Sequence, residues 1–424
     1  MKKLELKNII YIFILIIMIA IPFFKLMSYF LFLSGVIESS FDLNQVYVLW
    51  LSIPFLIFTY VYGIVTKKIK INYFDYLIYG LIVLGIISTI FAQDIMISIF
   101  GIDNRWEGLL SLLSYYLLFL NVKNLEEKHL KTIFKVFIIL GVIQVVYSIL
   151  QVYTSFGFVK DFSKPYMAMG LCANPNFLGS YMVMLLMISL SLYLLNDQKK
   201  YLILTIIFYI GLCLASSTGP FLSFILSFIF LVIVYFKKIK FKRVLIVIPI
   251  FIMLFFIIDY SNNILYSDYS SKKNYRKYNI KDEIVDTVKN YTSSDIKKEE
   301  NSRIRLWRNL IPVAKEYYLF GAGLDNLSLV YPRHIGGPIY DKAHNIYYHT
   351  LLTNGIFALI IYCVICFIIF LKGFKFKSNF YIALYMAFVA YSIQGFANIS
   401  VIDVAPYFFL ILGTLTTYKN ASLN

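Results

Sequence analysis

The sequence predicts an all-α polytopic membrane protein, with about twelve transmembrane helices and one long extracytoplasmic loop that contains amphipathic helices. Three observations support this fold class: the composition, the apolar runs and the placement of the lysines. Hydrophobic residues make up 60% of the 424 residues, and the mean hydropathy is +0.75. Apolar runs of roughly 18 residues or more recur, which is the length that a helix needs to cross a bilayer. A membrane β-barrel would instead show alternating segments of roughly ten residues.

Polar loops divide the apolar runs into twelve candidate spans, of which the last is short. The seventh and eighth are compatible with two full crossings or with a hairpin that does not fully cross, and both alternatives leave the remaining topology unchanged. The spans cover residues 8–33, 44–66, 73–92, 107–122, 131–153, 174–195, 201–216, 218–236, 243–260, 345–371, 380–397 and 404–418.

The lysines and arginines of the short loops set the orientation of these spans. Loops of one parity carry basic clusters such as those within residues 67–70 and 237–243, whereas the other parity carries Arg105, Lys160 and Lys164. Because short cytoplasmic loops are enriched in Lys and Arg, both termini are predicted to be cytoplasmic.

The same topology predicts three parts of the chain. Residues 1–260 form an N-terminal transmembrane bundle of about nine helices, residues 261–343 form the large extracytoplasmic loop, and residues 344–424 form the C-terminal transmembrane helices. Localisation in the plasma membrane, or the inner membrane of a two-membrane cell, follows from this prediction. The first helix reads as a retained one, not as a cleaved signal.

The net charge of +16 does not indicate a nucleic-acid partner, since most basic residues lie where membrane topology requires them. The sequence contains no Walker motif, glycine-rich nucleotide loop or paired zinc histidines. Cys363 and Cys366 lie within an apolar run without a neighbouring histidine, which favours plain packing over a metal or redox site. We therefore expect no metal and no cofactor.

The most informative segment, residues 301–355, interrupts this apolar background with arginines, tryptophan, glycines and histidine. Its first part has helical periodicity, and Pro312 is predicted to end or kink that helix near Ile311. Arg303 lies four residues before Trp307, so the two share a helix face. Such a helix is expected to lie on the membrane surface, where its arginines bind either lipid phosphates or a charged substrate.

The second part of the segment joins a tight turn, Phe320-Gly-Ala-Gly323, to Ala343-His344-Asn345 at the start of a membrane helix. The positive end of the helix dipole disfavours a protonated imidazole at His344. A neutral histidine can accept a proton, so His344 is a candidate general base. The alternative is a histidine that caps the helix or anchors it at the interface.

A further candidate is Arg105, which precedes another membrane helix and stands between Asp103 and Glu107. It is either the positive half of an ion pair with one of these carboxylates or an anion ligand that faces the same cavity as His344.

Taken together, these residues resemble the bacterial O-antigen ligase and O-antigen polymerase superfamily. The similarity is most specific over Arg303-x-x-x-Trp307, Phe320-Gly-x-Gly323, Ala343-His344-Asn345 and Gly355. Two further segments are similar to motifs of that family: Gly101-x-x-x-Arg105-x-x-Gly108, and residues 393–413 with Asn398 and Pro406.

The resemblance implies a metal-independent, inverting glycosyltransferase. Its partners would be a donor oligosaccharide linked to polyprenyl diphosphate, a glycan or lipid-linked acceptor, and membrane lipids. By this resemblance the catalytic residues are His344 and Arg303, with His344 acting on the acceptor hydroxyl. Arg105, Arg303 and Arg305 would bind the donor diphosphate, because the guanidinium group binds phosphate oxygens bidentately and stays charged. The supporting residues would be Trp307, Asn345 and Tyr348.

Three reactions remain open within this family: polymerisation of repeat units, ligation of a finished chain and glycosylation of a protein. The alternative from another class is a transporter or flippase, for which twelve spans are common. Transporters usually place ionisable residues or broken helices at the bilayer midplane. Here the polar cluster falls outside the apolar runs, which favours chemistry at the membrane surface.

Overall fold

The computed structural model describes residues 5–36, 45–154, 166–196, 198–265, 303–331 and 339–418. Most of the predicted loop between 261 and 343 lies outside these ranges, because residues 266–302 and 332–338 are not described. Within them every regular element is a helix, as the sequence predicts. A helix occupies the position of each of the twelve predicted spans.

Seven of the described helices are long and apolar enough to cross a membrane, so the chain is a multi-pass membrane protein. They are α1 (Leu6–Leu33), α2 (Val46–Val65), α3 (Tyr73–Ile90), α6 (Glu127–Tyr153), α7 (Pro175–Leu195), α10 (Phe241–Leu265) and α16 (Ile346–Gly373).

Five shorter helices occupy the remaining predicted spans: α5 (Leu109–Val122), α8 (Lys199–Ala215), α9 (Thr218–Val234), α17 (Asn379–Gln394) and α18 (Ala405–Thr416). Two residues, Ser216 and Ser217, separate α8 from α9, with Ser216 in the left-handed conformation. The number of crossings and the cytoplasmic termini stay predictions.

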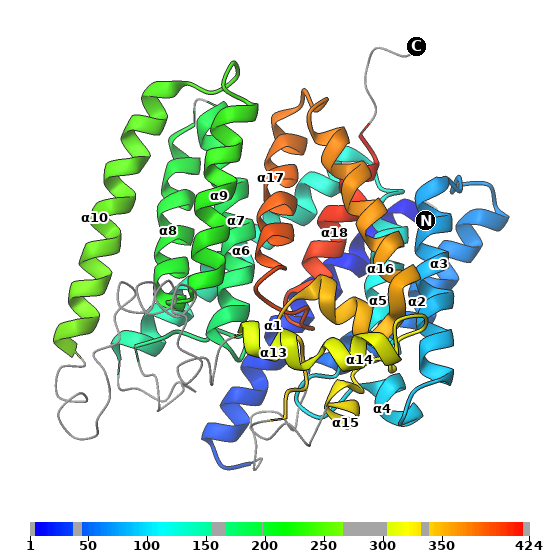
Figure 1. Ribbon diagram of the computed structural model, residues 1–424. Coiled ribbons are helices and arrows are strands. Elements are labelled where there is room, and N and C mark those ends of the chain that lie inside the picture. The colour runs from blue at the N-terminus through cyan, green and yellow to red at the C-terminus, as the bar shows by residue number, and fades with distance from the viewer. Residues whose placement is uncertain are drawn as a thin grey trace.

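The centre of the bundle is built from helices that are apolar on all sides. Helix α7 is buried over 89% of its most apolar window, whereas α10 is buried over 28%. Helix α7 packs against α8, α9 and α17, and α18 packs against α5 and α17. In Figure 1, α10 lies at one edge of the bundle and α2 and α3 at the other. The C-terminal helices thus lie among the N-terminal ones.

Four short helices gather at one end of this bundle: α4 (Ile95–Phe100), α13 (Arg303–Asn309), α14 (Ile311–Glu316) and α15 (Leu327–Val330). Helices α13 and α14 run crosswise to the long helices (Figure 1). They are separated at Leu310, and Pro312 lies in the first turn of α14, where a missing N–H leaves no helical hydrogen bond unmade. The predicted break near Ile311 is therefore confirmed.

The Phe320–Gly323 turn packs closely against a kink in α16, and glycines on both sides make this contact possible. Gly355 has φ 82° and ψ 176° inside that helix, and a Cβ atom there would lie 2.1 Å from the Leu319 carbonyl oxygen. A Cβ atom on Gly321, with φ 78°, would lie 2.2 Å from the Thr353 carbonyl. The freed backbone groups pair across the contact, since Ile356 N donates to Tyr318 O at 2.7 Å and Ala322 N donates to Leu352 O at 2.8 Å.

Replacing Gly355 by alanine is expected to lower the free energy of unfolding by at least about 1–3 kcal/mol, the usual cost of a strained backbone conformation. The clash with the Leu319 carbonyl adds to that cost. Thermal unfolding of the purified chain in detergent measures it. Gly219→Ala is the matched control, because its Cβ would meet Ala397 Cβ at an ordinary 3.5 Å. Equal midpoints for both variants would contradict the close approach.

Candidate functional site

The start of α16 presents His344 at the end of the bundle that carries α13 and α14. Asn345 is the N-cap, and its Oδ1 accepts a hydrogen bond from Tyr348 N at 2.9 Å. The backbone is further fixed because Ile346 N donates to Gly395 O at 2.8 Å. Asn345, not His344, therefore caps the helix, while His344 adopts φ 50° immediately outside it.

The imidazole of His344 is held in its neutral form. Burial is the first cause and the Arg303 charge the second, and with Arg105 and Lys342 they lower the pKa of His344 to about 4, against the opposing effect of Asp341. The sequence predicted a neutral imidazole from the helix dipole, whereas burial is the larger cause. The charges of Arg303 and Arg105 thus both act on this ring.

Trp307 fixes the backbone next to His344. Its indole Nε1 donates to Ala343 O at 2.8 Å, and the Tyr348 hydroxyl donates to Trp307 O at 3.4 Å. Trp307 and Tyr348 also pack against a second apolar cluster beside the main core, which includes Leu306 and Leu310. The ring of His344 meets Tyr340 edge-on at 6.4 Å, and not the tyrosines that follow it in α16.

Arg105 reaches the same segment through an ion pair. Its Nε lies 2.5 Å from Asp341 Oδ2, and both side chains are about a quarter exposed, at 27% and 28%. Burial opposes ionisation of Asp341, but the hydrogen bond and charge of Arg105 outweigh it and hold the pKa of that carboxyl below its usual value. Arg105 is thus paired, as one alternative predicted, although its partner is Asp341 rather than Asp103 or Glu107.

Beneath this ion pair lies a buried charge cluster that the sequence did not single out: Glu107, Asp325 and Lys342. Lys342 Nζ lies 3.1 Å from Glu107 Oε2 and also pairs with Asp325, and its side chain is 1% exposed. Burial alone would lower the pKa of Lys342, but the two carboxylates outweigh it and raise that pKa. Lys342 therefore stays charged two residues before His344.

Asp325 also shapes the loop that carries Arg105. Its Oδ2 accepts hydrogen bonds from Ile102 N and Glu107 N, both at 3.1 Å. The loop closes on itself at two glycines, because a Cβ on Gly101 would lie 2.5 Å from Glu107 N and one on Gly108 would lie 2.5 Å from Gly101 N. The Gly-x-x-x-Arg-x-x-Gly spacing is therefore a folded loop that presents Arg105.

A small pocket adjoins Arg105 on the side of α1 and α18. It is lined by Lys25, Gln45, Arg105 and Asp403 among others. Lys25 is 1% exposed, and Gln45 Nε2 donates to Asp403 Oδ1 at 2.5 Å. Lys25 lies inside α1, and the structure brings it to the same pocket as Arg105.

The predicted site residues thus lie on three segments that meet. Arg303, Arg305 and Trp307 are on α13, Arg105 is in the loop before α5, and His344, Asn345 and Tyr348 are at the start of α16. The charges of Arg303 and Arg105 both lower the pKa of His344, so the two arginines act on the same imidazole. It gives Trp307, Asn345 and Tyr348 supporting contacts around Ala343. The catalytic and binding roles of all these residues stay predictions.

Comparison with known proteins gives one match, and it covers the same part of the chain. No curated protein matches the chain. Residues 201–363 match the family model described as O-Antigen ligase. The match contains Arg303, Trp307, His344 and Gly355, the residues on which the resemblance was most specific. Over these residues, which make up less than half of the chain, the match supports the resemblance to the O-antigen ligase and polymerase superfamily of membrane glycan-transferring proteins.

Proposed function

We propose that the chain is a membrane glycosyltransferase that moves a glycan from a polyprenyl diphosphate carrier to an acceptor hydroxyl on the extracytoplasmic face. The observation that carries this proposal is a neutral, partly buried His344 beside Arg303 and the Arg105–Asp341 pair. A proton acceptor and two guanidinium groups near one another are what a hydroxyl nucleophile and a diphosphate leaving group require.

The arginines would act on the leaving group. As the bond from the anomeric carbon to the diphosphate oxygen breaks, negative charge builds on that oxygen, and fixed cations stabilise it most strongly in a site of low dielectric. Arg303 would contribute from α13 and Arg105 from its loop, whereas Arg305, two positions after Arg303, turns to another face of that short helix. Arg105 would exchange part of its contact with Asp341 for a phosphate oxygen, since both carboxylate and phosphate accept its planar fork.

His344 would act on the acceptor. The hydroxyl oxygen forms the new bond to the anomeric carbon and its proton passes to the neutral imidazole, so one displacement inverts the configuration. This step needs no metal ion. Lys342, Trp307 and Asn345 would serve as positioning residues, because their contacts fix the backbone on both sides of His344.

The test is the length distribution of glycans in a host depleted of this chain, followed on gels of lipid-linked and surface glycans. Collapse of long chains to single repeat units, with those units accumulating on the lipid, would support a polymerase. Normal-length chains stranded on the carrier would support a ligase. Complementation with the wild-type chain should restore the ladder. A ladder that depletion leaves unchanged would contradict glycan transfer and favour a different role.

A further inference from the structure

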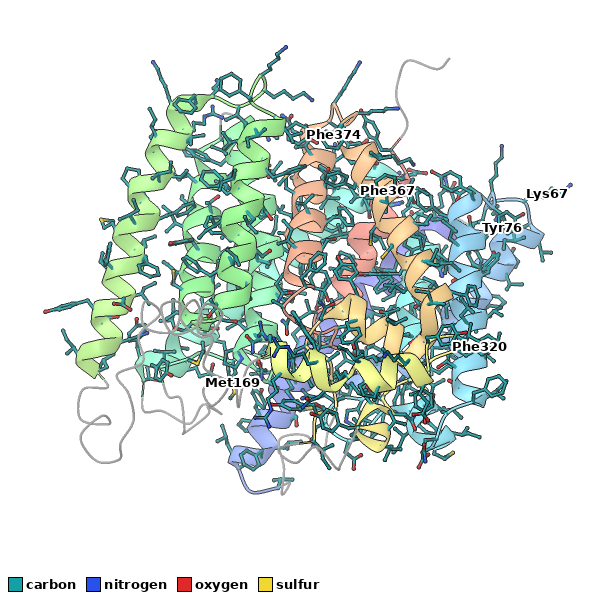
Figure 2. The ribbon with its side chains drawn as sticks, viewed as in Figure 1. Lys67, Tyr76, Met169, Phe320, Phe367 and Phe374 are labelled. Carbon is teal, nitrogen blue, oxygen red and sulfur yellow. The ribbon has the colours of Figure 1, made fainter. Side chains whose placement is uncertain are left out.

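A second basic and apolar site lies at the opposite end of the bundle from His344. Helix α16 starts at Ile346 beside the candidate site and ends at Gly373, and α17 then returns from Asn379 to Gln394. Phe374, which follows α16, and Phe320, next to the candidate site, lie at opposite ends of the bundle in Figure 2. A groove opens near the start of α17, between α17 and helices α6, α7 and α8.

This groove has a volume of about 600 Å³, within the roughly 300–1,000 Å³ of typical ligand pockets. Its walls change from polar to apolar in the same direction on all four helices. On α6, Lys131 and Lys135 precede Ile138 and Ile139, and on α8, Lys200 precedes Leu204. Because each residue advances a helix by about 1.5 Å, the lysines form a rim and the apolar walls lie one or two turns deeper.

The other two helices repeat the gradient. On α17, Ser378 and Asn379 precede Ala383 and Leu384, and α7, which runs the opposite way, passes from Ile188 to Asn196. The rim is ordered by side-chain contacts, since Asn379 Nδ2 donates to Asn196 Oδ1 at 2.8 Å. An aromatic pair, Phe134 and Phe380, with ring centroids 5.9 Å apart, lies at the level of that rim, since Phe134 stands between Lys131 and Lys135 on α6.

The charge at the rim is positive. Lys131, Lys135 and Lys200 all have exposed side chains and line the groove. Glu127 neutralises part of this charge through an ion pair with Lys131 at 2.7 Å, which leaves an excess of cations. Membrane topology alone accounts for lysines at this end, but not for three of them around one groove whose interior is apolar.

We propose that this groove binds an anionic phospholipid of the surrounding leaflet. The headgroup phosphate would bind the lysine rim, and an acyl chain would lie along the apolar walls between α6, α8 and α17. Basic pockets between transmembrane helices bind anionic headgroups in this way. The site would be independent of the glycan-transfer reaction, because it lies at the other end of the bundle.

The experiment is native mass spectrometry of the full chain in detergent, titrated with phosphatidylglycerol or phosphatidylcholine that carry the same acyl chains. The wild-type chain should retain phosphatidylglycerol preferentially. The triple variant K131Q/K135Q/K200Q should bind it at least about tenfold more weakly, since each basic residue near an anionic headgroup contributes favourably. Binding of phosphatidylcholine should change little.

The matched control is K67Q/K68Q/K70Q, which removes the same charge at the same end of the bundle, where Lys67 is marked in Figure 2, but outside the groove. An equal loss in this control would reduce the effect to general surface charge and overturn the proposal. Equal displacement of the lipid by glycerol 3-phosphate would exclude a role for the apolar walls. Stronger binding of a polyprenyl monophosphate than of phosphatidylglycerol would overturn the choice of occupant.

Discussion

Replacing His344 by alanine is expected to lower kcat/KM for glycan transfer by about 10²–10⁴-fold, the usual contribution of a general acid or base. The folded protein should be retained, because Asn345 caps α16 and Ile346 N is bonded to Gly395 O, both without the imidazole. Transfer from a lipid-linked donor in reconstituted vesicles, at matched protein levels, measures the change. His129→Gln is the control, because His129 lies in the first turns of α6 and stacks on Tyr11.

The pH profile separates a base from a merely structural histidine. Since the pKa of His344 is lowered to about 4, the imidazole remains neutral from pH 7 down to about that value. The acid limb of kcat/KM should therefore fall near pH 4. At pH 5 about nine-tenths of the imidazole would be neutral, against about 3% for an unperturbed histidine.

Arg303→Gln supplies the internal control for this profile. The Arg303 charge is the second-largest cause of the lowered pKa, so its removal should move the acid limb to higher pH, apart from any loss of donor binding. An acid limb near pH 6.5 in the wild-type chain would contradict the neutral, buried imidazole. Unchanged transfer in His344→Ala would contradict the catalytic role altogether.

The sequence predicted the helices well because apolar length alone defines a membrane helix. It placed the break between α13 and α14, since Pro312 has a purely local effect. It did not predict the kink of α16 at Gly355, because the cause is non-local. The Leu319–Phe320 backbone, which lies far from Gly355 in the sequence, occupies the space where a side chain would otherwise stand.

The candidate site shows the same division between local features, which the sequence predicted, and non-local contacts, which it did not. His344, Arg303 and Arg105 stood out because ionisable residues are rare in an apolar chain, and their resemblance to a family motif gave them roles. The partners of these residues were not predictable. Asp341 pairs with Arg105 across 236 positions of sequence. Asp103 and Glu107, the neighbours that local reasoning favoured, do not form that ion pair, because the loop folds back toward Asp325.

The Glu107–Asp325–Lys342 cluster carries the largest expected effect on stability. Lys342→Met should lower the free energy of unfolding by about 3–5 kcal/mol, because removing one partner of a buried ion pair leaves the others uncompensated. In this variant Glu107 and Asp325 would stay buried without the cation that pairs with both of them. Thermal unfolding in detergent and the yield of folded chain measure the loss. Lys70→Met, at an exposed position, is the control.

The sign of the pH dependence tests whether the stability loss of Lys342→Met is electrostatic. Burial raises the pKa of Glu107, and Lys342 opposes that rise. Without Lys342 the carboxyl should be protonated at a higher pH, so the deficit of the variant should shrink as the pH falls. The double variant E107Q/K342M should recover part of the loss for the same reason. A stability deficit that stays constant with pH would instead indicate lost packing. The charge cluster would then not stabilise His344 and the Arg105 loop through electrostatics.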